Sequence, residues 1–523
     1  MAHAMLRLLA TPTTMARLPS TIPLTSHPPR SPADRSRLAC RTVRFPKPLT
    51  RVLAALMVTV ACALAFAPGA MAHALVDQIT PADRARLDSG PARVEVRFTE
   101  PVQLLQQSDL TVVDSRGEPV SSGPGALRQG NASVIEVPVR PRLAPGSYTV
   151  RWRVVSADGH IIPGASVFAV GDVPLAAPYL GGPGGGEGPT ETSAWSVTAR
   201  WVELVGIGGL LALLLFRALI WRQAWRPPPR MPGGERDAAL SWARDAWWIG
   251  FGALALVALV GEALVLVVKT AASMGTSVWG ALADPAGIVR VLADTRFGDL
   301  LQIRTLALFV LFALGVWRFL VEYRSDDAPE PEDADGGLIP MLIMMVPALV
   351  AIGSLSAQGH ASTTGMPAVQ VPVDALHAAM ASAWIGGLAI ITVFLLRLPR
   401  VAGAGGRLVG GLSLARFSAL AVIAVALLVA SGVVRAFGQL TSPADLWQTS
   451  YGWTILVKIG LLAVAIVLAL RARRVVSALR RRPGPPNTAT LALVRRSAWV
   501  EIAITLVIVA FSALLVGQVP PIS

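Results

Sequence analysis

The chain has little cysteine and little charge. Only 2 of its 523 residues are Cys, at positions 40 and 62. This scarcity excludes a disulfide scaffold and a zinc or iron–sulfur centre held by thiolates. Charged residues make up 15% of the sequence and hydrophobic residues 53%, whereas soluble domains carry about 25% charge. The composition excludes an ordinary cytosolic globular protein and indicates a membrane protein.

Motifs of ATP-driven transport are missing as well. The glycine-rich stretch 181–186 lacks the Lys-Ser or Lys-Thr that completes a P-loop. The chain also has no Asp-Lys-Thr-Gly-Thr phosphorylation motif. Any transport by this chain is therefore expected to be driven by a gradient or by handoff of the transported ion.

The basic residues are concentrated at the amino terminus. The formal net charge is +14, and residues 1–72 hold nine Lys or Arg and one acid. Basic residues precede the apolar stretch 52–66, and Ala70-Met71-Ala72 follows it. This order predicts a signal peptide with an extended n-region over 1–72, cleaved to leave His73 first. The alternative is a retained membrane anchor. This placement of the charge argues against nucleic-acid binding.

Residues 73–171 have the pattern of a small all-β domain. Val94, Val96 and Phe98 alternate with charged residues, as in a half-buried strand. The other predicted strands are 110–113, 134–139 and 147–155, separated by turn residues. Short strands at this spacing predict a Greek-key β-sandwich. A flexible Gly/Pro linker is predicted over 172–194.

The rest of the chain, 195–523, is predicted to be an all-α polytopic membrane domain of about eight transmembrane helices. The predicted spans are 196–221, 246–268, 298–320, 338–358, 371–396, 413–436, 452–471 and 494–516. The connections 222–244, 397–416 and 471–496 are strongly basic, whereas 359–370 and 437–451 contain no Lys or Arg. The positive-inside rule then places the amino-terminal domain outside the cytoplasmic membrane.

Several ionisable residues fall within the predicted spans, where charge is costly and commonly functional. Glu203, Glu262, Arg304 and Lys458 all lie in the predicted outer half of the membrane. They are interpreted as a polar cluster that supports an outward-facing site. The alternative is snorkelling at helix ends together with structural ion pairs, such as Arg200 with Glu203.

The predicted mature chain keeps few histidines. Six occur in all, and His73, His160, His360 and His377 remain after the leader. An amino-terminal His73 could chelate a metal through its α-amine and ring Nδ1, a geometry that suits Cu(II). Asp158 and His160, separated by a glycine, are expected to complete this site. The alternative for His160 is a loop histidine bonded to the backbone.

A second pair of histidines belongs to the membrane domain. His360 lies just beyond the fourth predicted span, and His377 lies early in the fifth, followed by Met380 and Trp384 on nearly the same helix face. They are interpreted as a copper path in which Met380 is a soft ligand. The alternative for Met380 and Trp384 is packing. Gly386-Gly387 is expected to permit close helix packing.

Residues 73–171 resemble the CopC family of extracytoplasmic copper-binding domains. The resemblance is carried by His73-Ala74-Leu75, Pro81, Phe98 to Pro101, Leu143 to Trp152 and Ser156 to His160. It implies Cu(II) held by His73, Asp158 and His160. Some members also have a Met-rich Cu(I) site, which should be absent here because no Met occurs between His73 and Arg230.

The membrane domain resembles the CopD family. The resemblance is carried by Gly359 to Ala361, His377, Ala383 to Gly387, Arg416 to Ser418, Ser431-Gly432 and Thr449 to Lys458. A CopC–CopD fusion implies capture of Cu(II) outside and handoff to a membrane domain that moves Cu(I) or Cu(II), inward in our interpretation. The implied partners are copper ions, membrane lipid and an extracytoplasmic copper chaperone or reductase.

Other functions stay open at this stage. His360 and His377 could be axial ligands of a haem in a redox membrane protein, or the chain could confer copper resistance by sequestration or efflux. An amino-terminal His with a second His is also the copper site of monooxygenases. The small sandwich lacks an evident aromatic platform for a polymer substrate, so no enzymatic activity is predicted.

Overall fold

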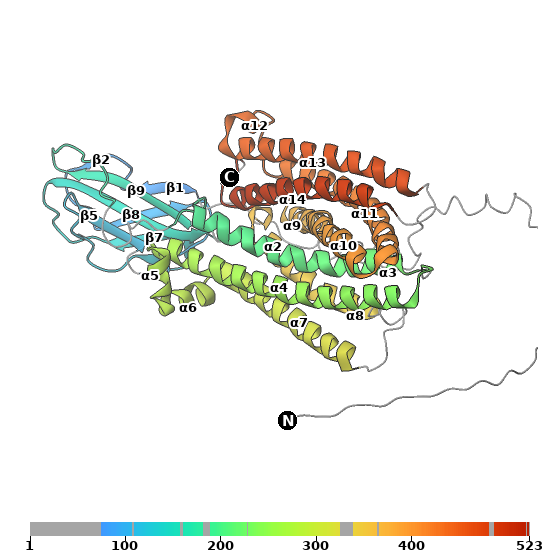
Figure 1. Cartoon of the computed structure of the whole chain (residues 1–523). Coiled ribbons are helices and arrows are strands. Elements are labelled where there is room, and N and C mark those ends of the chain that lie inside the picture. The colour runs from blue at the N-terminus through green and yellow to red at the C-terminus, as the bar shows by residue number, and fades with distance from the viewer. Residues whose placement is uncertain are drawn as a thin grey trace, which may run out of the picture. The chain divides into compact units, whose positions relative to one another are not determined.

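The computed structural model describes residues 75–106, 109–156, 161–180, 189–226, 229–324, 338–362, 366–480, 486–518 and 520–521. The predicted signal peptide and the predicted ligands His73, Asp158 and His160 lie outside the described residues. In the described part, strands come first along the chain and helices follow (Figure 1). This order confirms the predicted fold class.

The amino-terminal domain is a β-sandwich of two sheets. Its strands are β1 (Val76–Thr80), β2 (Ala85–Leu87), β3 (Arg93–Phe98), β4 (Val102–Gln103), β5 (Leu110–Asp114), β6 (Ala126–Arg128), β7 (Asn131–Pro138), β8 (Gly146–Ser156) and β9 (Ile161–Val170). One sheet has the order β1-β3-β7-β6, and the other has β2-β9-β8-β4, with β5 also paired to β8. The alternating apolar residues of β3 and β8 face each other in the core.

The strand β9 lacks a clean sequence signal because Pro163 and Gly164 interrupt its apolar pattern. Gly164 pairs with Trp152 across the sheet. A Cβ added to Gly164 would lie 2.2 Å from Trp152 Cζ2. The indole therefore covers the space that a side chain at 164 would need, and glycine is required for this packing.

The remainder of the chain is helical. Its elements are α2 (Ala194–Phe216), η3 (Arg217–Trp221), α3 (Arg222–Ala224), α4 (Gly233–Met274), α5 (Val278–Leu282), α6 (Pro285–Asp294), α7 (Arg296–Arg324), α8 (Leu338–Gln358), η4 (His360–Ser362), α9 (Pro367–Ala381), η5 (Ser382–Gly386), α10 (Gly387–Val401), α11 (Gly403–Phe437), α12 (Asp445–Gln448), α13 (Ser450–Arg480) and α14 (Thr488–Val516). Within the described residues, eight helices are long and apolar enough to cross a membrane. The short helices α5, α6 and α12 were not predicted from the sequence.

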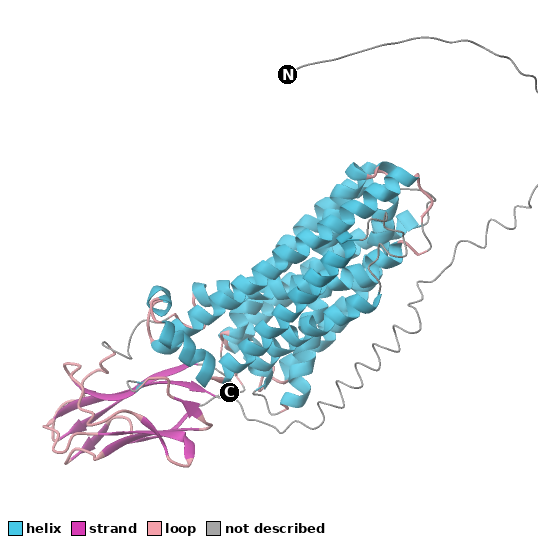
Figure 2. Cartoon of the chain, turned by 90° about the horizontal axis from the view of Figure 1, so that it is seen from below, coloured by secondary structure: helices cyan, strands magenta, loops and turns pink. Residues whose placement is uncertain are grey.

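The long helices run side by side (Figure 2), and many of their apolar side chains face outward. Ile249, Leu306 and Ile339 are 73%, 65% and 72% exposed. A protein in water rarely exposes so much contiguous apolar surface. This surface is therefore suited to lipid.

The fifth span contains a π-helical segment, η5, directly after α9. A Cβ on Gly386 would lie 2.3 Å from Ala212 Cβ on α2, and one on Gly387 would lie 2.7 Å from Phe417 Cε2 on α11. These two glycines let the fifth span approach α2 and α11 closely where η5 joins α10. The π-turn changes the helix face that the residues after it present.

Candidate functional site

The segment between β3 and β4 contacts both the start of the described chain, at Leu75, and the end of β8, at Ser156. Leu75, the first described residue, donates its N–H to Thr99 Oγ1 at 3.0 Å and accepts the Thr99 N–H at 2.9 Å. Nearby, Val102 pairs with Ser156, the last residue of β8. Leu75 and Ser156 are the described neighbours of the predicted Cu(II) ligands. Each of them therefore contacts one end of the segment 99–102.

Glu100 lies in the same segment and is buried, with 8% of its surface exposed. Its carboxylate adds an oxygen donor to this segment, and oxygen and nitrogen donors suit Cu(II). Glu100 was not among the predicted ligands, because one acid after a strand is an ordinary loop residue. The signal that could have identified it is its place within the motif from Phe98 to Pro101.

The sandwich also contacts the helical domain. Val155 and Ile161 border residues 157–160, and both pack in an apolar cluster with Val265 of α4 and Phe297 of α7. In addition, Arg153 Nη1 donates to the Ala272 carbonyl oxygen at 2.8 Å, near the end of α4. We call this set of contacts the sandwich–helix contact. It holds Val155 and Ile161, on either side of residues 156–160, against α4 and α7.

Asp109 lies beside the sandwich–helix contact. Its Oδ2 accepts the N–H groups of Leu105 and Gln106, each at 2.7 Å. Burial raises the pKa of its carboxyl to about 6, although these two hydrogen bonds and the charges of Arg153 and Arg290 lower it. Burial likewise lowers the pKa of Arg153, against the charge of Asp109.

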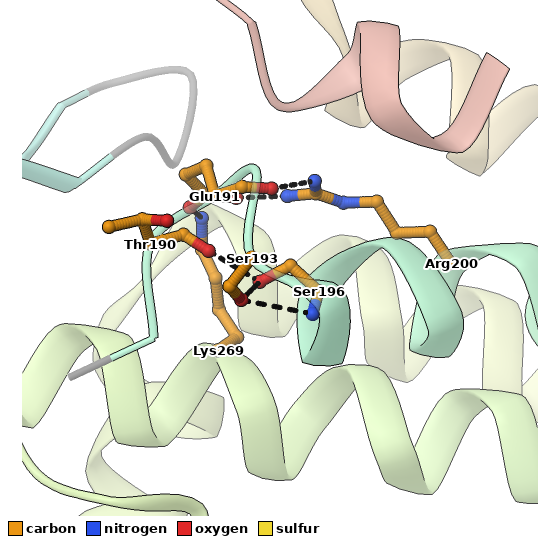
Figure 3. A network of polar contacts seen from close by, with 6 residues as sticks. All are labelled: Thr190, Glu191, Ser193, Ser196, Arg200 and Lys269. Carbon is orange, nitrogen blue, oxygen red and sulfur yellow. Dashed lines mark hydrogen bonds and ion pairs between the residues drawn. The ribbon is translucent and has the colours of Figure 1, made fainter. Parts of the chain in front are cut away.

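The end of the linker is bound to the first two spans (Figure 3). Glu191 forms an ion pair with Arg200 of α2 and another with Lys269 Nζ of α4 at 2.6 Å. Arg200 Nη1 also donates to the Glu191 carbonyl oxygen at 2.8 Å. Ser193 caps α2 by accepting the Ser196 N–H. Arg200 thus pairs with Glu191 and not with Glu203, the structural pair considered from the sequence.

Below this network lies a cavity of ≈ 30 Å³. Glu191, Arg200, Lys269 and Gln358 line it, together with apolar residues of α2, α4 and α7. A cavity of this size and polarity can hold about one or two water molecules. Residues of the charged network and Gln358, the last residue of α8, thus line the same cavity.

Arg304 of α7 is buried between two carboxylates from other helices. Its side chain is 0% exposed, and its Nη2 lies 2.8 Å from Glu203 Oε1. Its Nε donates to Glu262 Oε1 at 2.5 Å, and its Nη1 donates to Gln358 Oε1 at 2.8 Å. Three members of the predicted polar cluster therefore form one group, which we call the buried triad: Glu203, Glu262 and Arg304.

Lys458 belongs to a different group. Its charged neighbours are Arg435 and Asp374, and these two form an ion pair at 2.7 Å between Arg435 Nε and Asp374 Oδ1. Lys458 and Arg435 are also the cations that act on His377. The predicted polar cluster is therefore two groups, one at the buried triad and one at His377.

Close contact between α2 and α4 positions the triad. A Cβ on Gly261 would lie 2.5 Å from the Glu203 Cα, and a Cβ on Gly206 would lie 2.4 Å from the Ala258 backbone N. Small residues permit such an approach between membrane helices. Glu262 follows Gly261 directly, so this approach brings it to Glu203.

His360 begins the short η4 segment after α8 and is 6% exposed. Its ring meets the Tyr451 ring edge to face, with centroids 6.3 Å apart. The Tyr451 hydroxyl donates to Gln439 Oε1 at 2.6 Å. The predicted first copper ligand of the membrane domain is therefore enclosed by protein.

His377 of α9 is oriented by a hydrogen bond between its Nδ1 and Ser431 Oγ of α11, at 3.0 Å. The Ser431 hydroxyl also lies 2.7 Å from the Leu427 carbonyl oxygen and 3.1 Å from that of Leu428. A neutral imidazole held in this way is a competent metal ligand.

Met380 is half-buried and packs against two apolar clusters of the bundle. Trp384 is 2% exposed and belongs to one of them. Both contacts agree with a packing role. Among the described residues, no three His, Cys, Asp or Glu side chains come close enough to hold a metal ion.

Comparisons with known proteins give the family. Residues 76–171 match the family model of the CopC domain, and residues 412–515 match that of Copper resistance protein D. Together with the sandwich and the eight apolar helices, these matches define a multi-pass membrane protein with a CopC domain. The chain belongs to the family in which CopC and CopD domains occur in one polypeptide. His360 and His377 precede the part matched to CopD.

Individual proteins are similar to parts of this chain. Copper transport protein CutJ of Bacillus subtilis (strain 168) is 28% identical over 397 residues, which are 76% of this chain and 67% of that protein. Copper resistance protein C of Xanthomonas campestris pv. juglandis is 34% identical over 125 residues, 23% of this chain and 96% of that one. The crystal structure of CopC from Methylosinus trichosporium OB3b is similar at 27% identity and a TM-score of 0.17, covering 20% of this chain and 100% of that one.

Proposed function

We propose that this protein acquires copper. The sandwich captures Cu(II) outside the cytoplasmic membrane at His73, Asp158 and His160, with Glu100 as a further oxygen donor. The membrane domain then moves copper inward, and no catalytic step is required. The family to which the chain belongs, named for copper transport and copper resistance, supports copper as the ion.

The sandwich–helix contact is the observation that supports handoff within one chain. Val155 and Ile161 border the loop with the predicted Asp158 and His160, and both pack against membrane helices. A captured ion would therefore be held close to the ends of α4 and α7. A sandwich on a free tether would instead have to find the membrane domain by diffusion.

In the membrane domain we propose His360 as the first ligand and His377 as the next. The hydrogen bond between His377 Nδ1 and Ser431 Oγ, which orients the imidazole, supports this role. Cu(II) favours nitrogen and oxygen donors, whereas Cu(I) favours soft ligands. An extracytoplasmic reductase or copper chaperone is the expected partner if Cu(I) is the form transported.

Cell-associated copper tests this function. A deletion strain would carry the wild-type chain, His360→Ala or the matched control Met366→Leu, an exposed residue close to His360 in sequence. Acquisition predicts that the wild type and Met366→Leu raise cell copper and that His360→Ala does not. A wild type that lowers copper would reverse the direction, and one without effect on copper would overturn the transport function. In that case a haem absorption spectrum would be examined next.

The capture site has a separate test. A secreted domain with a free His73 terminus should bind one Cu(II), measured by electron paramagnetic resonance and competition with a chelator. A retained Met before His73 should weaken binding sharply because the chelating α-amine is lost. Equal affinity of both forms would contradict the amino-terminal site.

A further inference from the structure

The buried triad carries one more negative group than positive. Glu203 and Glu262 are 3% and 4% exposed, and Arg304 between them is 0% exposed. The other charged residue acting on Glu203 is Arg200 on its own helix. Arg200 is already paired with Glu191. If both carboxylates were ionised, a net negative charge would lie in a site closed to water.

The hydrogen bonds of the triad lack one donor. Arg304 Nε donates to Glu262 Oε1 and its Nη1 donates to Gln358 Oε1, whereas its Nη2 lies 2.8 Å from Glu203 Oε1 as an ion pair without hydrogen-bond geometry. Glu203 Oε1 and Glu262 Oε2 are buried, and neither receives a hydrogen bond from any donor in the described part of the chain. The two carboxyl groups lie within hydrogen-bonding reach of each other. Two ionised carboxylates would repel at this distance, whereas one proton between them forms a hydrogen bond.

We propose that Glu203 and Glu262 share one proton and thus form a proton-binding site in the membrane domain, from which copper arriving at His360 releases that proton. The shared proton supplies the missing donor and leaves the triad neutral: one carboxylate, one carboxylic acid and one guanidinium. The proton comes from water and returns to water, and Gln358, which accepts from Arg304, also lines the polar cavity described above.

The connection to copper passes through α8. Gln358 ends α8 and accepts from Arg304, and His360 follows it by two positions. This second part of the proposal rests on the proposed function of His360. A copper cation bound at His360 adds positive charge two positions from Gln358, the acceptor of Arg304 Nη1, and this charge favours the ionised form of both carboxyl groups. By linkage, proton binding at the triad must in turn weaken copper binding.

Infrared spectroscopy of the purified full-length protein in detergent tests the shared proton without requiring transport. A protonated buried carboxyl gives a carbonyl band that shifts in D₂O. We expect this band in the wild type at neutral pH and its loss in both Glu203→Gln and Glu262→Gln, since one carboxylate then remains as a simple ion pair with Arg304.

The matched control is Glu501→Gln. Glu501 is also buried in a span, but Ser497 on its own helix supplies its hydrogen bond at 3.0 Å. Glu501→Gln should retain the band of the triad. The proposal is overturned if the band is absent from the wild type, as for two carboxylates around a bound metal cation, or if it survives in Glu262→Gln. Elution volume and circular dichroism show whether each variant is folded.

Copper release is measured on the same sample. Copper(II) chloride, with and without ascorbate, should weaken the band in the wild type and leave it unchanged in His360→Ala. A wild-type band that persists with bound copper would overturn the release step. Failure of copper accumulation in cells would instead overturn the proposed function, and the band of the copper-free protein would still report the shared proton.

Discussion

Arg304 Nη1 donates a hydrogen bond to Gln358 Oε1 at 2.8 Å, and Gln358 stands two positions before His360. One buried guanidinium therefore connects α2, α4 and α7 with the segment that carries the first proposed membrane ligand. A change at the triad is expected to reach His360 through two side chains.

Arg304→Gln should be strongly destabilising. The substitution leaves two buried carboxyl groups without their cation, and breaking a buried ion pair typically costs about 3–5 kcal/mol. Thermal unfolding of the full chain in detergent, followed by tryptophan fluorescence, measures this loss. The control Arg400→Gln removes an exposed arginine that, within the described residues, donates to the Leu396 carbonyl on its own helix, and it should change little. Equal melting temperatures for both variants would contradict the triad.

Gly261→Ala should also destabilise the membrane domain. Its Cβ would lie 2.5 Å from the Glu203 Cα, a backbone atom that cannot yield without moving α2. Overpacking of this kind costs about 1–3 kcal/mol. Gly460→Ala on α13 is the matched control, because nothing lies within 4 Å of its added Cβ. If Gly261→Ala melted like Gly460→Ala, the close approach of α2 and α4 would be refuted.

Asp109 should give the stability of the chain a pH dependence. Burial raises its pKa to about 6 in the folded protein, against about 3.9 when unfolded. Between these values the folded state binds more protons, so the free energy of unfolding falls as pH rises from about 4 to about 6. The fall is at most about 3 kcal/mol, with no further change above this range.

Asp109→Asn should remove this component, which is measured as the difference in unfolding free energy between about pH 4.5 and 7. Asp172→Asn, at a fully exposed carboxyl, should retain the wild-type profile. A wild-type stability that rises over the same interval, with Asp109→Asn unchanged from it, would contradict the burial of a protonated Asp109.

The sequence predicted most of the fold because its signals are local. Period-2 alternation located β3, β5, β7 and β8, and apolar length located all eight spans. The strand β9 was missed because Gly164 is needed only against Trp152, a contact between strands. The helices α5, α6 and α12 were missed because they are too short for a periodic signal.

The sequence predicted which ionisable residues of the membrane domain matter, but not which of them contact one another. Charge in an apolar span marks Glu203, Glu262, Arg304 and Lys458 individually. Which of them meet depends on helix packing, through which Lys458 joins Arg435 and Asp374 instead of the triad. The sandwich–helix contact could not be predicted either, because a valine such as Val155 is typical of any strand and does not reveal that it packs against α4 and α7.

Val155→Asp should separate capture from handoff. A carboxylate placed in the apolar cluster with Val265 and Phe297 is costly, and it should loosen the sandwich–helix contact. Cell copper should fall toward the level of the deletion strain. The secreted domain that carries the same substitution should still bind Cu(II). The control Arg97→Ala, on an exposed position of β3, should accumulate copper normally. Normal accumulation by Val155→Asp would refute a role of this contact in handoff.

Ser431→Ala should reduce copper uptake, because Ser431 acts on copper only by orienting His377. The substitution removes the hydrogen-bond partner of His377 Nδ1 and with it the constraint on the ring orientation. Loss of such a partner of a metal-ligating histidine typically costs about 10–100-fold in affinity or activity. The initial rate of copper accumulation should fall accordingly, and Ser431→Thr, which retains the hydroxyl, should recover most of it. Ser477→Ala removes a serine that bonds only the Arg474 carbonyl on its own helix, and it should keep the wild-type rate. If Ser431→Ala also kept that rate, His377 would not be oriented for copper by Ser431, and its buried imidazole would be a packing residue of α9.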